Sequence, residues 1–162
     1  MEGNKIADLD IQNCEVYGTS DLKRQIAAEE KALPVYIFKN GITVVPCYGA
    51  GLWGPIWGYI ALEPDMNTVK GIVLDHSGET PGLGAEIATN WFRNNFTGKK
   101  IYNAEGEFTS VKVVKGGAAE DDINGVDAIS GGTITSQALE KAIKSWLEAY
   151  VPYFETLKAV EE

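Results

Sequence analysis

The residues best suited to chemistry lie in one short segment, residues 127–136, which reads Asp-Ala-Ile-Ser-Gly-Gly-Thr-Ile-Thr-Ser. It joins hydroxyl side chains and adjacent glycines to the start of a strongly patterned helix. A helix N-terminus offers free backbone N–H groups and partial positive charge, so this segment suits a phosphate group. A hydroxyl here also has an ordinary structural role, because Thr133, Thr135 or Ser136 can each be the N-cap of the helix. The lysine of a P-loop is missing, since Lys141 comes too late and belongs to the helix.

The composition argues against several other classes of site. The formal net charge is −9 and the pI is about 4.6. This charge argues against a nucleic-acid partner, which needs clustered Lys and Arg. His76 is the only histidine, and Cys14 and Cys47 form no Cys-x-x-Cys pair, so no metal site is expected. No catalytic residue is predicted.

The helix that follows the segment is the clearest element. Apolar residues recur three and four positions apart from Leu139 to Tyr150, which predicts one buried face. Pro152 is expected to kink or end this helix. Further helices are expected at residues 20–33 and 83–96, and strands at residues 35–38, 42–45, 56–62, 68–75 and 108–114.

Glycine-rich loops separate these elements. Asn40-Gly41 predicts a tight hairpin turn between the first two strands. Trp53 lies in a loop over residues 49–55, and residues 77–84 form a second glycine-containing loop. The tryptophans expected in the core are Trp57, Trp91 and Trp146.

The whole chain, residues 1–162, is predicted to be a single α+β domain with an antiparallel or mixed sheet and flanking helices. Residues 42–62 carry no charge, but prolines and glycines within them break any membrane-spanning helix. No signal peptide is visible at the N-terminus.

Residues 127–136 resemble the flavinylation motif of the membrane-bound NADH:quinone reductases that pump sodium, in which a threonine carries FMN through a phosphoester. That motif is an Asp, two residues, a Ser-Gly-Ala-Thr run, any residue, a Thr and often a Ser. Gly132 stands where alanine is usual. The matching residues are Asp127, Ser130, Gly131, Thr133, Thr135 and Ser136.

Three further segments carry the same resemblance. Residues 51–53, 58–69 and 78–86 are similar to the NqrC family, the FMN-carrying subunits of these reductases, and occur in matching order. The Glu-Thr-Pro-Gly-Leu-Gly part of the last segment is shared with the equivalent FMN subunit of the related Rnf complex.

The resemblance implies that Thr135 carries a covalent FMN, supplied from FAD by a separate flavin transferase that uses a metal ion. The loop before the helix would hold the phosphate, with Lys115 near it. Trp53, Leu83 and Thr80 would form the ring site, and His76 is a further candidate beside it. The candidate cofactor-binding residues are Leu52, Trp53, Glu79, Thr80, Leu83, Gly84, Lys115, Ser130, Gly131, Gly132, Thr133, Ile134 and Thr135.

The function implied by the resemblance is electron transfer within the sodium-pumping NADH:quinone oxidoreductase. The expected partners are the other subunits of that complex, with the flavin transferase for maturation. Such a protein is anchored in the bacterial inner membrane by an N-terminal transmembrane helix, with its flavin domain on the periplasmic side. That helix is absent here, so the chain is expected to be a truncated soluble part. Two alternatives stay open: the equivalent FMN subunit of the Rnf ferredoxin:NAD oxidoreductase complex, and a non-redox module whose loop caps the helix or binds a phosphate ligand.

Overall fold

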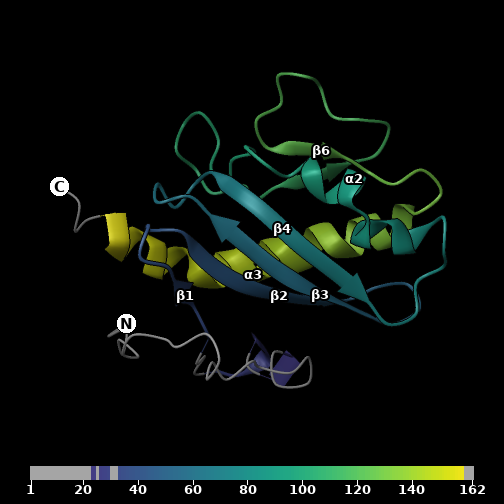
Figure 1. The fold of residues 1–162 in the computed structure, drawn as a ribbon, viewed down its shortest axis with the longest axis horizontal. Helices are drawn as coiled ribbons and strands as arrows, with labels where there is room; N and C mark the ends of the chain where they lie inside the picture. Colours follow the sequence, from purple (N-terminus) through teal and green to yellow (C-terminus); the bar gives the residue numbers. More distant parts are fainter. Residues whose placement is uncertain (1–22, 25, 30–32, 159–162) are drawn as a thin grey trace.

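A four-stranded antiparallel sheet forms the centre of the structure, with its strands side by side in chain order (Figure 1). The computed structural model describes residues 23–24, 26–29 and 33–158. The last helix, α3 (Thr133–Lys158), runs along one face of the sheet. The predicted α+β class is therefore confirmed. The strands are β1 (Tyr36–Ile37), β2 (Thr43–Ala50), β3 (Pro55–Leu62) and β4 (Val69–His76).

Tight turns join the first three strands. Gly41 has a φ of +84° and donates its N–H to Phe38 O at 2.9 Å, and the Phe38 N–H donates to Ile42 O at 2.9 Å. The predicted hairpin forms, but its loop has three residues, 39–41, and Asn40 does not have the positive φ that the expected two-residue turn requires. β2 runs past the expected residue 45, so Ala50 pairs with Pro55 of β3. The loop that carries Trp53 is therefore a short turn over residues 51–54, closed by the Gly51 N–H donating to Gly54 O at 2.8 Å.

α3 packs its apolar face against the inner face of the sheet. A Cβ atom at Gly49 would lie 2.6 Å from the Cβ of Ala142, so β2 and α3 approach each other more closely there than a side chain would permit. Trp146 adds a hydrogen bond from its Nε1 to Tyr48 O at 2.8 Å. The predicted apolar stripe is confirmed, because each of its members is buried: Leu139, Ala142, Ile143, Trp146, Leu147 and Tyr150.

Pro152 does not end this helix, which continues to Lys158. The expectation of an end there was wrong because the residues beyond the proline are still anchored in the core. Phe154 is fully buried, and its ring stacks on Tyr150 with 5.9 Å between the centroids. These contacts outweigh the backbone hydrogen bond that a proline removes.

The single helix expected over residues 83–96 is two short elements. A 3₁₀ helix, η2 (Gly84–Ala88), is separated from α2 (Asn90–Asn94) by Thr89, whose backbone is extended. This break rotates Trp91 outward, where it is 52% exposed, so its predicted place in the core was wrong. The neighbouring Phe92 is fully buried instead of Trp91.

The strand expected over residues 108–114 is shorter. Ser110 has a φ of +63°, which interrupts it, and only β5 (Lys112–Val114) forms. β5 pairs in parallel with β6 (Gly125–Asp127), a strand that was not predicted. These two strands form a second small sheet, and β6 leads directly into the segment before α3.

Two further expectations concern the first expected helix and a membrane-spanning helix. Half of the helix expected at residues 20–33 lies outside the described residues; of the described ones, residues 23, 24, 26 and 27 are helical, whereas residues 28, 29 and 33 are not. Within the described residues, no helix combines the length and apolar character that a bilayer span requires.

Candidate functional site

The segment 127–136 links β6 to the first turn of α3. Gly131 has a φ of +75°, so the turn requires glycine, and a Cβ there would lie 2.7 Å from the side-chain end of the exposed Leu83. The Ser136 N–H donates to Gly132 O at 2.9 Å as the first helical bond. Gly132 therefore occupies the N-cap position.

The three hydroxyls expected as N-cap candidates are consequently not the cap, because the helix already begins at Thr133. Ser136 Oγ instead accepts a hydrogen bond from the Ile129 N–H at 3.1 Å, which ties the loop to the helix. The hydroxyl of Thr135 has a different partner in a distant segment.

Thr135 donates its hydroxyl to Glu79 Oε2 at 2.5 Å. Both side chains are buried, with Thr135 1% and Glu79 4% exposed. Glu79 Oε1 accepts the N–H of Trp53 at 2.9 Å, and the Glu79 N–H donates to His76 Nδ1 at 3.2 Å. The carboxylate of Glu79 thus connects the 51–54 turn to the start of α3, and its backbone N–H connects the same residue to the end of β4.

The backbone of Gly84 covers the Thr135 hydroxyl. A Cβ at Gly84 would lie 2.5 Å from Thr135 Oγ1 and 3.2 Å from Thr135 Cβ. The turn is held by Thr80, whose carbonyl accepts the N–H groups of Leu83 and Ala85, both at 3.1 Å. Residues 80–85 therefore form a compact cover over Thr135.

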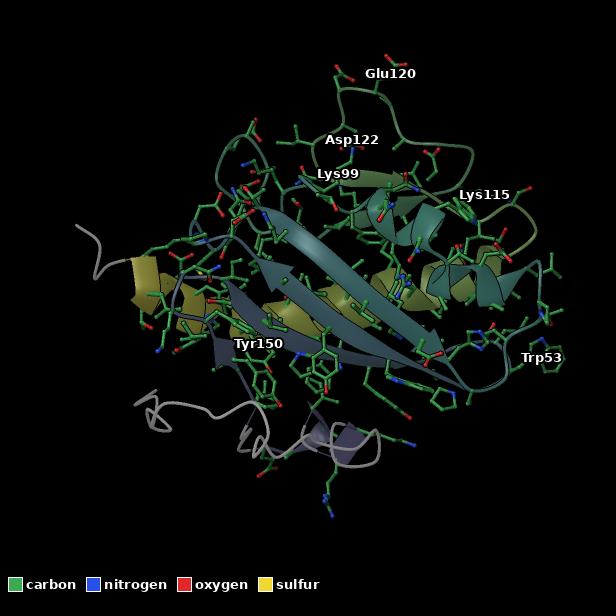
Figure 2. All side chains as sticks on the ribbon, in the orientation of Figure 1. Trp53, Lys99, Lys115, Glu120, Asp122 and Tyr150 are labelled. Carbon is green, nitrogen blue, oxygen red and sulfur yellow. The ribbon has the colours of Figure 1, made fainter. Side chains whose placement is uncertain are left out.

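Large apolar side chains remain exposed around this cover. They come from the 51–54 turn, the 80–84 turn and the start of α3. Figure 2 shows Trp53 at the end of the molecule, with its ring pointing away from the sheet. Exposed apolar groups gathered from separate segments mark a binding surface. The exposed fractions are 45% for Leu52, 68% for Trp53, 42% for Leu83 and 57% for Ile134.

A cavity of about 420 Å³ is lined by this segment and by residues 115–117. Lys115 lines it, and Figure 2 shows Lys115 at the same end of the molecule as Trp53. Gly116 and Gly117 have φ of +88° and +101°, and Asp127 Oδ1 accepts the Ala118 N–H at 2.8 Å, so this turn is fixed against β6. The remaining lining residues are residues 127–131 and Thr133.

The structure brings the predicted site residues together around the start of α3. Lys115 faces the cavity with the loop before the helix, whereas the residues of the 51–54 and 80–84 turns lie on the side of the cover. Sequence reasoning missed the contributions of Asp127, Gly116 and Gly117 to the cavity. The Gly116-Gly117 pair was a visible signal, since adjacent glycines permit the positive φ angles found there. Among the described residues, no group of three or more His, Cys, Asp or Glu side chains is arranged to hold a metal ion.

The FMN-binding domain family matches residues 51–148, a range that contains both turns and the start of α3. The C subunit (NqrC) of the Na(+)-translocating NADH-quinone reductase from Haemophilus ducreyi is 38% identical over 146 residues, covering 86% of this chain and 56% of that protein. Its counterpart from Pasteurella multocida is 41% identical over 132 residues, covering 77% and 50%. The chain thus spans about half the length of the curated relatives it matches.

Two solved structures show the same fold. NqrC from Shewanella oneidensis aligns with a TM-score of 0.71 and 40% identity, covering 85% of this chain and 67% of that one. The corresponding structure from Parabacteroides distasonis aligns with a TM-score of 0.66 and 49% identity, covering 70% and 56%. The chain therefore belongs to the FMN-binding domain family, in the group of the NqrC proteins of Na(+)-translocating NADH-quinone reductases.

Proposed function

We propose that this chain is the electron-transfer part of a Na(+)-translocating NADH-quinone reductase and that it carries FMN on Thr135 through a phosphoester. The observation that carries this proposal is the position of Thr135 inside the family match. Its hydroxyl lies in the first turn of α3, beneath a glycine-rich cover and between exposed apolar side chains.

The residues present fit the phosphate end of FMN. The first turn of a long helix offers free N–H groups and partial positive charge to an anion. Lys115 adds a cation to the adjoining cavity, which the loop before α3 and Asp127 also line and which Thr135 itself does not. Gly131, which a side chain would push against Leu83, keeps the backbone of the loop accessible.

The residues present also fit the ring end. An isoalloxazine ring needs a flat apolar wall, and exposed apolar surface is present on three neighbouring segments. FMN, when bound, supplies reversible one- and two-electron transfer. This chain would supply the wall, the phosphate contacts and the exclusion of water on one side. The wall residues are Leu52, Trp53, Leu83 and Ile134.

Attachment at Thr135 requires the cover to open, because that residue is only 1% exposed. Gly84 lies directly against the hydroxyl, so it must move before a flavin donor reaches the oxygen. This need for opening fits modification by a separate flavin transferase acting on the folded protein.

The name of the relatives supports assembly with the other subunits of the reductase and thereby association with the membrane. The N-terminal anchor, the position on the periplasmic side and the use of a transferase stay predictions from the resemblance. Trp53 lies at an exposed end of the molecule, which is a position that an electron-transfer partner could reach.

Intact-mass measurement tests the proposal. Protein co-expressed with a flavin transferase should gain the mass of one FMN less one water. Thr135→Val, which keeps the side-chain volume but removes the hydroxyl, should abolish the gain, whereas Thr135→Ser should keep it. A gain that survives in Thr135→Val would refute the assignment of Thr135. Wild-type protein that gains no mass beside an active transferase would refute covalent attachment.

A further inference from the structure

Glu79 is a buried carboxylate with an unusual set of partners. A buried carboxylate normally has a cationic partner or several hydrogen-bond donors, because losing water is costly for a charge. None of the ion pairs found among the described residues involves Glu79. Instead, its Oε1 accepts a hydrogen bond from the Trp53 N–H, and its Oε2 accepts one from the Thr135 hydroxyl.

Two glycines shape the slot that holds this carboxylate. A Cβ at Gly51 would overlap Glu79 Oε1, and a Cβ at Gly84 would overlap Glu79 Oε2. Neither glycine has a positive φ, so neither is required by the backbone conformation. The two glycines therefore make room for the carboxylate, which is held with one oxygen on Trp53 and the other on Thr135.

We propose that Glu79 is the general base for attachment of FMN to Thr135; this inference rests on the function proposed above. Thr135 Oγ1 already donates its proton to Glu79 Oε2, so the base and the nucleophile are within hydrogen-bond reach. Thr135 Oγ1 forms a bond to the FMN phosphorus of FAD held by the transferase, while its O–H bond breaks and the proton passes to Glu79. The P–O bond to AMP breaks at the same time, and AMP leaves with the electron pair.

The charge on the product supports the same assignment. A phosphodiester on Thr135 is an anion, and a second anion on Glu79 would repel it strongly in a site from which water is excluded. Transfer of the Thr135 proton to Glu79 removes this second negative charge at the moment when the ester forms. The hydroxyl proton of Thr135 is therefore taken up where it also relieves repulsion.

Glu79→Gln tests the base with little change of shape. The amide oxygen still accepts the Trp53 N–H, but the amide NH₂ then faces Thr135 and takes up no proton. The assay mixes purified chain, purified transferase and FAD, and follows the mass gain and the AMP released over time. We expect the initial rate to fall on the order of 100-fold or more in Glu79→Gln, the usual contribution of a general base.

Two further variants separate charge from shape. Glu79→Asp keeps a carboxylate one methylene shorter, and it should retain a rate clearly above that of Glu79→Gln. Glu86→Gln, on the neighbouring η2, changes a carboxylate that accepts Trp91 Nε1 at 3.0 Å, and it should react at the wild-type rate. Thermal unfolding of each variant checks that the fold persists. If Glu79→Gln does not fold, Glu79→Ala takes its place: a folded Glu79→Ala that reacts at least tenfold more slowly than Glu79→Asp supports the base, and one that reacts as fast as Glu79→Asp overturns it.

The outcomes distinguish this inference from the function on which it rests. Wild-type protein that takes up no FMN defeats the proposed function itself. Folded Glu79→Gln that reacts within twofold of a wild type that does take up FMN on Thr135 overturns only the role of Glu79. Equal losses in Glu79→Gln and Glu79→Asp would also overturn it, because shape alone would then explain the effect.

Discussion

Gly84 is the position at which the smallest added side chain would disturb the candidate site most. A Cβ there would lie 2.5 Å from Thr135 Oγ1 and 3.2 Å from Thr135 Cβ, and it would overlap Glu79 Oε2. Gly84 is not among the residues with positive φ, so alanine has an acceptable backbone conformation. The effect of Gly84→Ala therefore comes from the contact and not from strain in the main chain.

The expected loss of stability follows from two contributions that the added methyl group changes: the packing of the interior and the hydrogen bond between Thr135 and Glu79. Overpacking a tight interior lowers stability by about 1–3 kcal/mol. A hydrogen bond to a charged group contributes about 1.5–3 kcal/mol, and the methyl group must separate Glu79 from Thr135. Because the two side chains partly relax, we expect the free energy of unfolding to fall by about 3 kcal/mol. This corresponds to about 6–12 °C in Tm for a chain of this size.

Urea unfolding followed by circular dichroism measures this change, and Gly71→Ala is the matched control. Gly71 lies in β4 with no atom within 4 Å of its added Cβ and without positive φ, so its substitution should change stability by less than about 1 kcal/mol. Attachment of FMN should also slow in Gly84→Ala, because the hydroxyl is displaced from Glu79. A Gly84→Ala protein as stable as Gly71→Ala and modified at the wild-type rate would contradict the reasoning.

Three further outcomes are expected from the described structure. Trp146→Phe should lower the free energy of unfolding by about 2 kcal/mol in urea, because it leaves the Tyr48 carbonyl without its donor in the core. Burial raises the pKa of the Cys47 thiol to about 12, so iodoacetamide at pH 8 should label Cys47 only after denaturant is added. Burial raises the pKa of Asp65, but the hydrogen bonds from Thr68 and its neighbours outweigh it and hold this pKa below its usual range. A folded-state pKa below the unfolded one adds stability above about pH 4 that is lost as the pH falls through the folded value, so Asp65→Asn should flatten the acid side of the stability–pH curve.

The local sequence was sufficient to predict the main elements, β3 and α3. β3 alternates between buried and partly buried residues, with Ile56, Ile60 and Leu62 inward; it was predictable as a short apolar run that the Glu63-Pro64-Asp65 turn ends. α3 was predictable because its stripe recurs over several turns. Neither element needs information from elsewhere in the chain to choose between helix and strand.

The spacing of apolar residues failed as a guide where the backbone departs from the helix or where pairing with another strand decides the local structure. Leu83, Ile87 and Trp91 follow helical spacing, yet only Ile87 is buried, because the extended Thr89 divides the segment. β6 has three residues and acquires its strand conformation only by pairing with β5. No pattern over such a short segment specifies a partner elsewhere in the chain.

The local sequence likewise predicted the turns of the candidate site but not the contacts between its distant segments. The glycine turns and the residues before α3 were found from their composition, since turn chemistry is local. The pairing of Glu79 with Thr135 joins residues 56 positions apart, and it depends on the packing of η2 over the helix start. Glu79 was named as a candidate through the resemblance alone, without any indication of its partner.

Ile129 explains how the loop stays packed although Gly132 stands where the resembled motif has alanine. A Cβ at Gly132 would lie 2.9 Å from Ile129 Cγ2 and 3.1 Å from Ile129 Cβ, so the isoleucine fills the space of the missing methyl group. Ile129 is 3% exposed, and its N–H donates to Ser136 Oγ on the first turn of α3. The loop therefore has no empty space at the position of the missing methyl group. Thr135 is consequently held from two directions, by the anchored Ser136 beside it and by Glu79 across the cover, so its position does not depend on the residue at 132 alone.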